Sequence, residues 1–112
     1  AIKRIRKGCA AAPFMVAGTG RFCTGIMEEC GEDALVKVGA EGVYCAAFPK
    51  QGLGVALKID DGTQRGAEVA MGAILRQHGV IDDAKAETLK KYLTPVLTNW
   101  AGKYAGDLRP AF

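Results

Sequence analysis

The chain of 112 residues contains no serine and only one histidine, His78. The absence of serine excludes a serine nucleophile supplied by these residues themselves. The four cysteines, Cys9, Cys23, Cys30 and Cys45, form no CxxC pair, and with His78 they complete no zinc-finger spacing. We therefore expect the reduced thiols of a cytoplasmic protein, with two disulfides as the alternative.

The chain also lacks the features of membrane, exported and nucleic-acid-binding proteins. Its longest uncharged stretch, Gly8 to Gly20, contains Pro13 and is too short to span a bilayer. No basic and apolar sequence of the signal-peptide type opens the chain. The net charge is only +3, most of it in the run Lys3–Lys7, which is weaker and narrower than the basic bias of nucleic-acid binders. These absences predict a cytoplasmic location, with neither a membrane nor a nucleic acid as partner.

What is present is the composition of a soluble globular chain, with 49% hydrophobic and 24% charged residues. Apolar periodicity predicts helices over residues 1–11 and 84–93, a helix that carries Phe22, Ile26, Met27 and Cys30, and another that begins after Asp61. Three short runs rich in β-branched and aromatic residues, 34–38, 43–48 and 54–59, are separated by glycine-bearing links that favour an antiparallel meander. Phe14–Ala17 is a short apolar segment before a turn, and residues 95–112 show no clear period.

Polar residues and glycines indicate where two of these helices begin or end. Thr19 is the expected N-cap of the helix that carries Phe22 and Cys30, and Gly31 is its expected C-terminal stop. For the helix after the third strand, Asp61 pairs with Gln64 as a capping box, and Thr63 is the alternative N-cap.

The predicted fold class is α+β, with residues 1–112 forming one segment of one domain. A three-stranded sheet with one helix across it leaves one face and two edges uncovered. We therefore expect other polypeptide to complete the domain.

Lys37 is the first candidate for chemistry, because it lies inside an apolar strand and is followed by Gly39. A lysine in such a run either points to solvent or is held where desolvation favours its neutral form. A Lys-x-Gly sequence at a strand edge allows close approach of a substrate, and the next N–H, that of Ala40, can serve an oxyanion.

Cys23 is the second candidate, because it lies in the first turn of a predicted helix and just after Arg21. A helix N-terminus and a guanidinium both favour a thiolate, while the alternative is a small buried core residue. Glu41 can orient Lys37 or Arg21, or it can be a hairpin residue in water. Asp60 and Asp61 are turn residues in preference to metal ligands.

Three runs that occur in order along the chain resemble successive signatures of one family. They are Val16–Thr24 (VAGTGRFCT), Lys37–Cys45 (KVGAEGVYC) and Gly52–Gly62 (GLGVALKIDDG). The match continues in Arg65–Ala70, Asn99–Trp100 and Gly106–Arg109. The family is the bacterial asparaginase II family, of which the rhizobial-type inducible L-asparaginase is typical, and the resemblance is to its C-terminal part.

The resemblance implies a serine β-lactamase/glutaminase-like fold and the hydrolysis of L-asparagine by a serine–lysine mechanism. It implies that Lys37 activates a serine, that the Ala40 N–H binds the oxyanion, and that Cys23 helps to bind zinc. Arg21 and Glu41 are then expected beside the substrate. Both serines, the partner lysine and the other zinc ligands belong to the family's N-terminal part, so these residues alone are expected to be inactive.

Two hypotheses of different classes follow from the sequence. The first is the C-terminal segment of an asparaginase II-type amidohydrolase, whose partners are L-asparagine, the N-terminal part of the same protein and further copies of itself. The second is a non-catalytic, stand-alone binding or interaction module that keeps the fold segment. A thiol-dependent metal or redox protein is a third option, and it would require the isolated chain to bind metal or oxidant stoichiometrically.

Overall fold

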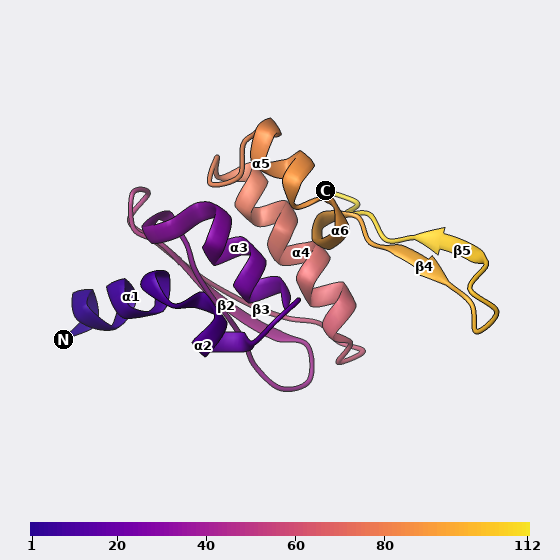
Figure 1. Cartoon of the computed structure of the whole chain (residues 1–112), viewed down its shortest axis with the longest axis horizontal. Coiled ribbons are helices and arrows are strands. Elements are labelled where there is room, and N and C mark those ends of the chain that lie inside the picture. The colour runs from indigo at the N-terminus through magenta and orange to yellow at the C-terminus, as the bar shows by residue number, and fades with distance from the viewer.

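The computed structural model describes all 112 residues and has an α+β architecture, which confirms the predicted fold class (Figure 1). The helices are α1 (Ile2–Ala11), α2 (Pro13–Ala17), α3 (Phe22–Cys30), the 3₁₀ turn η1 (Gly31–Asp33), α4 (Gln64–Gln77), α5 (Asp83–Thr88) and α6 (Lys90–Leu93). The strands are β1 (Leu35–Val38), β2 (Val43–Phe48), β3 (Leu53–Lys58), β4 (Val96–Thr98) and β5 (Tyr104–Asp107). No helix is long and apolar enough to cross a membrane.

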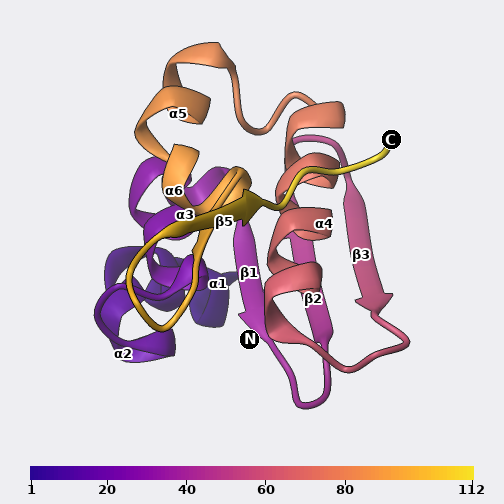
Figure 2. The same cartoon turned by 90° about the vertical axis from the view of Figure 1, so that its right-hand side faces the viewer.

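The main sheet is an antiparallel meander in the order β1-β2-β3, as predicted. Alternation along β2 sends Tyr44, Ala46 and Phe48 to a buried face and Cys45 to an exposed face. Helices α3 and α4 pack on the buried face (Figure 2). The other edges of β1 and β3 have no strand partner, so the predicted open edges are present.

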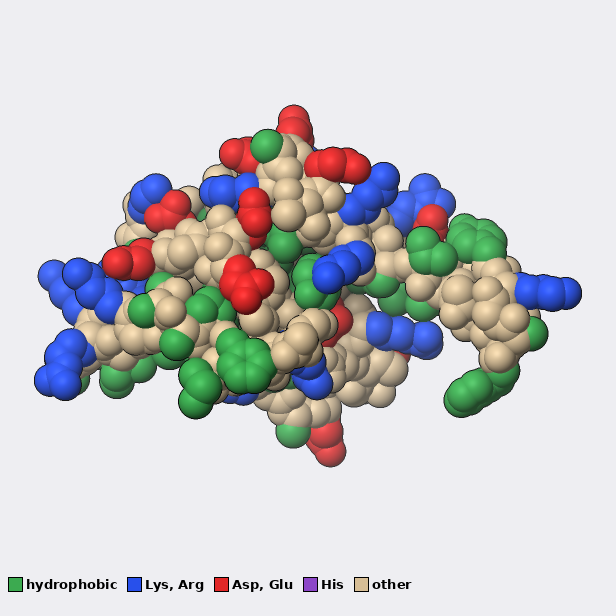
Figure 3. Space-filling model, viewed as in Figure 1, with side chains coloured by type: hydrophobic (Ala, Val, Ile, Leu, Met, Phe, Trp, Pro, Cys, Tyr) green, Lys and Arg blue, Asp and Glu red, His purple; other side chains and the backbone are tan.

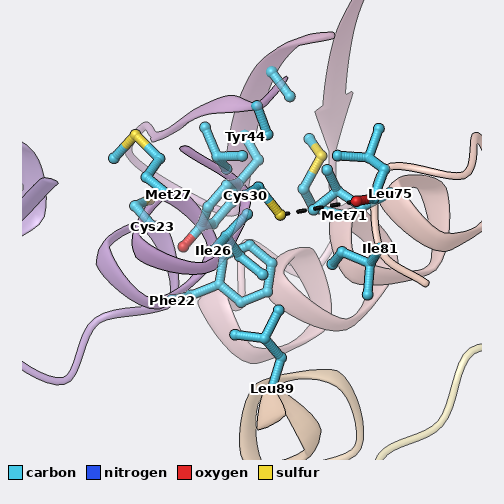
Figure 4. Packing of buried hydrophobic residues seen from close by; sticks show 14 of the residues in the cluster. Phe22, Cys23, Ile26, Met27, Cys30, Tyr44, Met71, Leu75, Ile81 and Leu89 are labelled. Atoms are coloured by element: carbon cyan, nitrogen blue, oxygen red, sulfur yellow. Dashed lines mark hydrogen bonds between the residues drawn. The ribbon is translucent and has the colours of Figure 1, made fainter. Parts of the chain in front are cut away.

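The core lies between this sheet face and the helices. Its largest fully buried side chains include Phe22 and Ile26 of α3, Tyr44 of β2, and Met71 and Leu75 of α4 (Figure 4). Burying an aliphatic or aromatic side chain of this size stabilises a fold by about 1.5–3 kcal/mol. The same packing determines where α3 meets β1, which is the region of both candidate residues for chemistry.

The two ends of the chain pack less than the centre. Helix α1 buries none of its residues, and its Ile2 and Ile5 are exposed. Basic side chains gather at this end of the molecule (Figure 3). At the other end, the hairpin β4–β5 extends away from the body, with Trp100 fully exposed at its tip (Figure 1). The molecule is therefore elongated, with extents of 47 × 29 × 25 Å.

Several local predictions need correction. Thr19 does not cap α3, whose N-cap is Arg21, because the glycine turn places Thr19 two residues too early. Thr63, not Asp61, is the N-cap residue of α4, while Asp61 Oδ1 accepts hydrogen bonds from the Thr63 N–H and hydroxyl. Gly31 ends α3 with φ 57°, as predicted.

The remaining corrections concern element boundaries. The short apolar segment after Pro13 is a helix, since proline suits the first helical position. The helix expected over 84–93 is two short helices, and the tail without a clear period forms a hairpin. The third strand lies one residue earlier than expected. All four cysteines are free thiols, as expected for reduced cysteines.

Candidate active site

Lys37 lies on β1, directly opposite Cys45 of β2. Its side chain is exposed, and its Nζ donates a hydrogen bond of 2.7 Å to the carbonyl of Val38. The sequence left open whether this amine points to solvent or is desolvated. In this chain it is not buried, because β1 is an edge strand and a long side chain can turn around the edge.

The free edge of β1 carries main-chain donors beside this amine. Gly39 N–H donates to Val43 O at 2.7 Å, so in an antiparallel ladder the N–H of Val38 faces away from β2. The Ala40 carbonyl accepts from Val43 N–H, whereas the Ala40 N–H takes part in no hydrogen bond. A free N–H two residues from the end of the strand is the type of donor that an oxyanion needs.

The turn after β1 has an unusual backbone that fixes the position of Ala40. Glu41 has φ 56° and Gly42 has φ 71°, so two successive residues adopt the left-handed conformation. For a glutamate this conformation costs roughly 1–2 kcal/mol. Gly42 is buried, and its carbonyl accepts a hydrogen bond of 3.0 Å from Ile59 N–H, which ties the turn to the residue after β3.

Cys23 lies in the first turn of α3 and packs beside the end of β1, with 1% of its surface exposed. The Val38 N–H is directed toward its sulfur, and the charge of Lys37 is close enough to affect its ionisation. The structure therefore brings Cys23 and Lys37 together at one end of the β1 edge. Packing of α3 against β1 accounts for this proximity of two residues that are 14 positions apart in the sequence.

The environment of Cys23 favours the neutral thiol over a thiolate. Burial raises the pKa of Cys23 above its ordinary value of 9.0, and it outweighs the lowering by the Val38 N–H, the Tyr44 hydroxyl and the Lys37 charge. Of the two alternatives that the sequence left open for Cys23, the structure therefore favours the small buried core residue over the reactive thiolate, because the cost of losing water exceeds the effect of a helix N-terminus. Cys23 lies beside Lys37 whether its thiol is neutral or ionised.

Two residues that the sequence did not single out complete this region. The Tyr44 hydroxyl donates a hydrogen bond of 3.1 Å to Glu68 Oε1, and on its other side it lies toward Cys23 (Figure 4). Burial raises the pKa of Tyr44, and the neighbouring Cys23 and Glu68 side chains disfavour the phenolate further. The sequence pattern that could have identified these two residues was a tyrosine at a core position of β2 and a glutamate on the sheet-facing side of α4.

Arg21 and Glu41, the predicted substrate-binding residues, are both exposed and form no ion pair with each other or with Lys37. Arg21 directly precedes α3, the helix of Cys23, and Glu41 follows β1, the strand of Lys37. The larger surface hollows of the chain are lined by other residues. The site that these residues form is an open strand edge.

Zinc was predicted at Cys23, and the donor set can be compared with that prediction. No group of three or more His, Cys, Asp or Glu side chains lies together in the structure. A catalytic zinc ion takes about three protein ligands and a structural one about four. The residues of this chain therefore do not form a zinc site by themselves, and zinc at Cys23 stays a prediction that needs ligands from other polypeptide.

The fold and the site define an α+β chain whose open strand edge presents an amine and an unpaired main-chain N–H beside a buried thiol. A family model described as L-asparaginase II matches residues 1–110, so the chain belongs to the L-asparaginase II family. This membership supports an L-asparaginase-like function and implies asparagine as the substrate. No curated protein matches the chain.

Proposed function

We propose that this chain provides part of the active site of an amidohydrolase that converts L-asparagine and water into L-aspartate and ammonia. The observation that carries the proposal is the Lys37 amine on the edge strand β1, with the free Ala40 N–H in the turn that follows, in a member of the L-asparaginase II family. The domain would be a serine β-lactamase/glutaminase-like fold completed by polypeptide outside these residues, which also supplies the serine.

The reaction assigns a distinct task to each group. The serine oxygen attacks the side-chain carbonyl carbon of asparagine while Lys37, as a neutral amine, takes the hydroxyl proton. The Ala40 N–H donates to the oxyanion of the tetrahedral intermediate, and Lys37 returns the proton to the amide nitrogen, so that the C–N bond breaks, ammonia leaves and the acyl-enzyme forms. Water then attacks the acyl-enzyme, releasing aspartate and restoring the serine.

The exposure of Lys37 is consistent with a site completed by other polypeptide. Covering the β1 edge would exclude water from the amine, and desolvation favours the neutral form of an amine. Arg21, just before α3, and Glu41, after β1, are exposed and would bind an amino acid, whose carboxylate and ammonium groups carry opposite charges. The proposal also includes three properties of the whole protein. It assembles with further copies of itself, it is located in the cytoplasm, and it binds zinc at Cys23 with ligands from other polypeptide.

The test replaces Lys37 with methionine, which keeps the length of the side chain and removes the amine. In the protein that contains this chain, Lys37→Met should lower kcat for ammonia release from asparagine by about 100-fold or more. Lys58→Met is the matched control, because Lys58 also lies on a strand of the same sheet and its Nζ also donates to the carbonyl of the next residue, Ile59. The control should leave kcat within about twofold of the parent.

Two results would decide against the enzyme. Turnover of Lys37→Met near that of the parent removes lysine from the mechanism. No ammonia release from the parent protein favours the alternative, a non-catalytic binding or interaction module.

A further inference from the structure

Tyr44 occupies the point where β2 meets both α3 and α4. Its backbone lies directly opposite Val38 of β1, and 1% of its surface is exposed. Its ring packs edge-on against Phe22, with the centroids 5.5 Å apart and the planes at 85°. A ring held between these neighbours has little freedom to move, so the direction of its hydroxyl is set by packing.

Glu68 of α4 holds that hydroxyl from one side. Its Oε1 accepts the hydrogen bond from Tyr44 at 3.1 Å and a second one from Gln64 Nε2 at 2.7 Å. Two donors on one carboxylate oxygen restrict the rotamer of Glu68, and hydrogen bonds to a charged acceptor are stronger than neutral ones. The phenol is therefore tied to the first two turns of α4.

The same hydroxyl faces Cys23 of α3 from the other side (Figure 4). Cys23 in turn lies against the Val38 N–H at the free edge of β1. Tyr44 is thus joined to Glu68 by a hydrogen bond and lies beside Cys23, which in turn lies beside Val38, so that this set of contacts includes one residue from each of four elements.

The end of this set of contacts lies between the two candidate groups for chemistry. Val38 directly follows Lys37 and precedes Ala40 by two residues. Because β1 pairs with a strand on one side only, its contact with α3 determines where its free edge lies. A displacement of about 1 Å in a reacting group can lower the rate of a reaction about 100-fold.

We propose that Tyr44 and Glu68 are positioning residues for the reaction, which hold the end of β1, with Lys37 and Ala40, in place against α3. This inference rests on the proposed amidohydrolase function. The two residues act through hydrogen bonding and touch neither substrate nor the reacting atoms.

The experiment compares four single variants in the protein that contains this chain. Tyr44→Phe keeps the ring and removes the hydroxyl; Glu68→Met keeps the volume and removes the acceptor; Glu68→Gln keeps the acceptor and removes the charge. Tyr92→Phe is the matched control, because the Tyr92 ring also packs edge-on against Phe22, at 6.1 Å, while its hydroxyl makes no hydrogen bond.

The expected result is a selective loss of turnover. Tyr44→Phe and Glu68→Met should each lower kcat about 10-fold with KM changed less than about twofold, since the reacting groups are displaced while the substrate still binds. Glu68→Gln should restore kcat to at least about a third of the parent value, and Tyr92→Phe should match the parent. Tyr44→Phe with kcat within twofold of the parent overturns the inference, and so does Glu68→Gln with a loss equal to that of Glu68→Met.

A second measurement separates this inference from the proposed function. Alkylation of Cys23 by iodoacetamide, followed by peptide mass spectrometry, should be about 10-fold faster in Tyr44→Phe than in the parent and unchanged in Tyr92→Phe. An unchanged rate in Tyr44→Phe overturns the inference, whatever the activity. If the parent releases no ammonia while the Cys23 rate responds as expected, the proposed function fails and the polar contacts remain.

Discussion

Replacing Gly42 with alanine should destabilise the protein because two separate costs add. The residue has φ 71°, and the left-handed conformation costs an alanine about 1–2 kcal/mol. An added Cβ would also lie 3.0 Å from the carbonyl carbon of Gly62 and 3.1 Å from Ile59 Cβ. The first of these is a backbone atom that cannot rotate away, and overpacking of this kind typically costs about 1–3 kcal/mol. The expected loss is therefore about 2–5 kcal/mol in the free energy of unfolding.

Gly52→Ala provides the matched control in the next hairpin. Gly52 has φ 63°, but no atom lies within 4 Å of an added Cβ, so only the conformational cost applies, about 1–2 kcal/mol. Urea unfolding of parent and variants gives both free energies, with the slope of each curve as a check that the unfolded states are comparable. Equal losses for Gly42→Ala and Gly52→Ala would refute the close approach of the two turns, and with it the argument that Gly62 and Ile59 hold the turn that carries Ala40.

Two further predictions concern titratable groups. Cys45 is exposed and should react rapidly with a thiol reagent, whereas the buried thiols of Cys23 and Cys30 should react about 100-fold more slowly. A difference in rate of about 100-fold corresponds to a local opening free energy of about 3 kcal/mol. Rapid modification of either buried thiol at neutral pH would contradict the packing of α3. The pKa of Asp61 is lowered from its ordinary value of 3.8, chiefly by the hydrogen bond from the Thr63 N–H. Because the folded pKa is depressed, the stabilisation by Asp61 is present above pH 3.8 and is lost as the pH falls through the folded pKa. The difference in urea midpoint between the parent and Asp61→Ala should therefore shrink on acidification below pH 3.8, and a constant difference would contradict it.

Local sequence was sufficient where a short-range rule applies. The helix that ends before Pro13, the meander with its glycine-bearing turns, and the end of α3 at Gly31 follow from side-chain alternation and backbone freedom within a few residues. The hairpin β4–β5 was missed because its strands are three and four residues long. Strands that short do not establish an alternating pattern.

The environment of Cys23 shows why the site was harder to predict. A helix N-terminus and a neighbouring arginine indicated a thiolate, but burial against β1 and β2 raises the pKa of the thiol. Burial depends on residues distant in sequence, and desolvation exceeds the effect of a helix end when a group loses its water. Tyr44 and Glu68 were missed for the same reason, since their hydrogen bond joins residues 24 positions apart.

The sequence by itself determined the family, the α+β class and the order of the main elements, because motifs, periodicity and turn residues are properties of neighbouring positions. Only the tertiary structure decided that Lys37 is exposed at a strand edge, that Cys23 is buried beside it, and which polar side chains connect the helices to that edge. Contacts between distant residues and the loss of water around them arise from packing, and no local pattern specifies them.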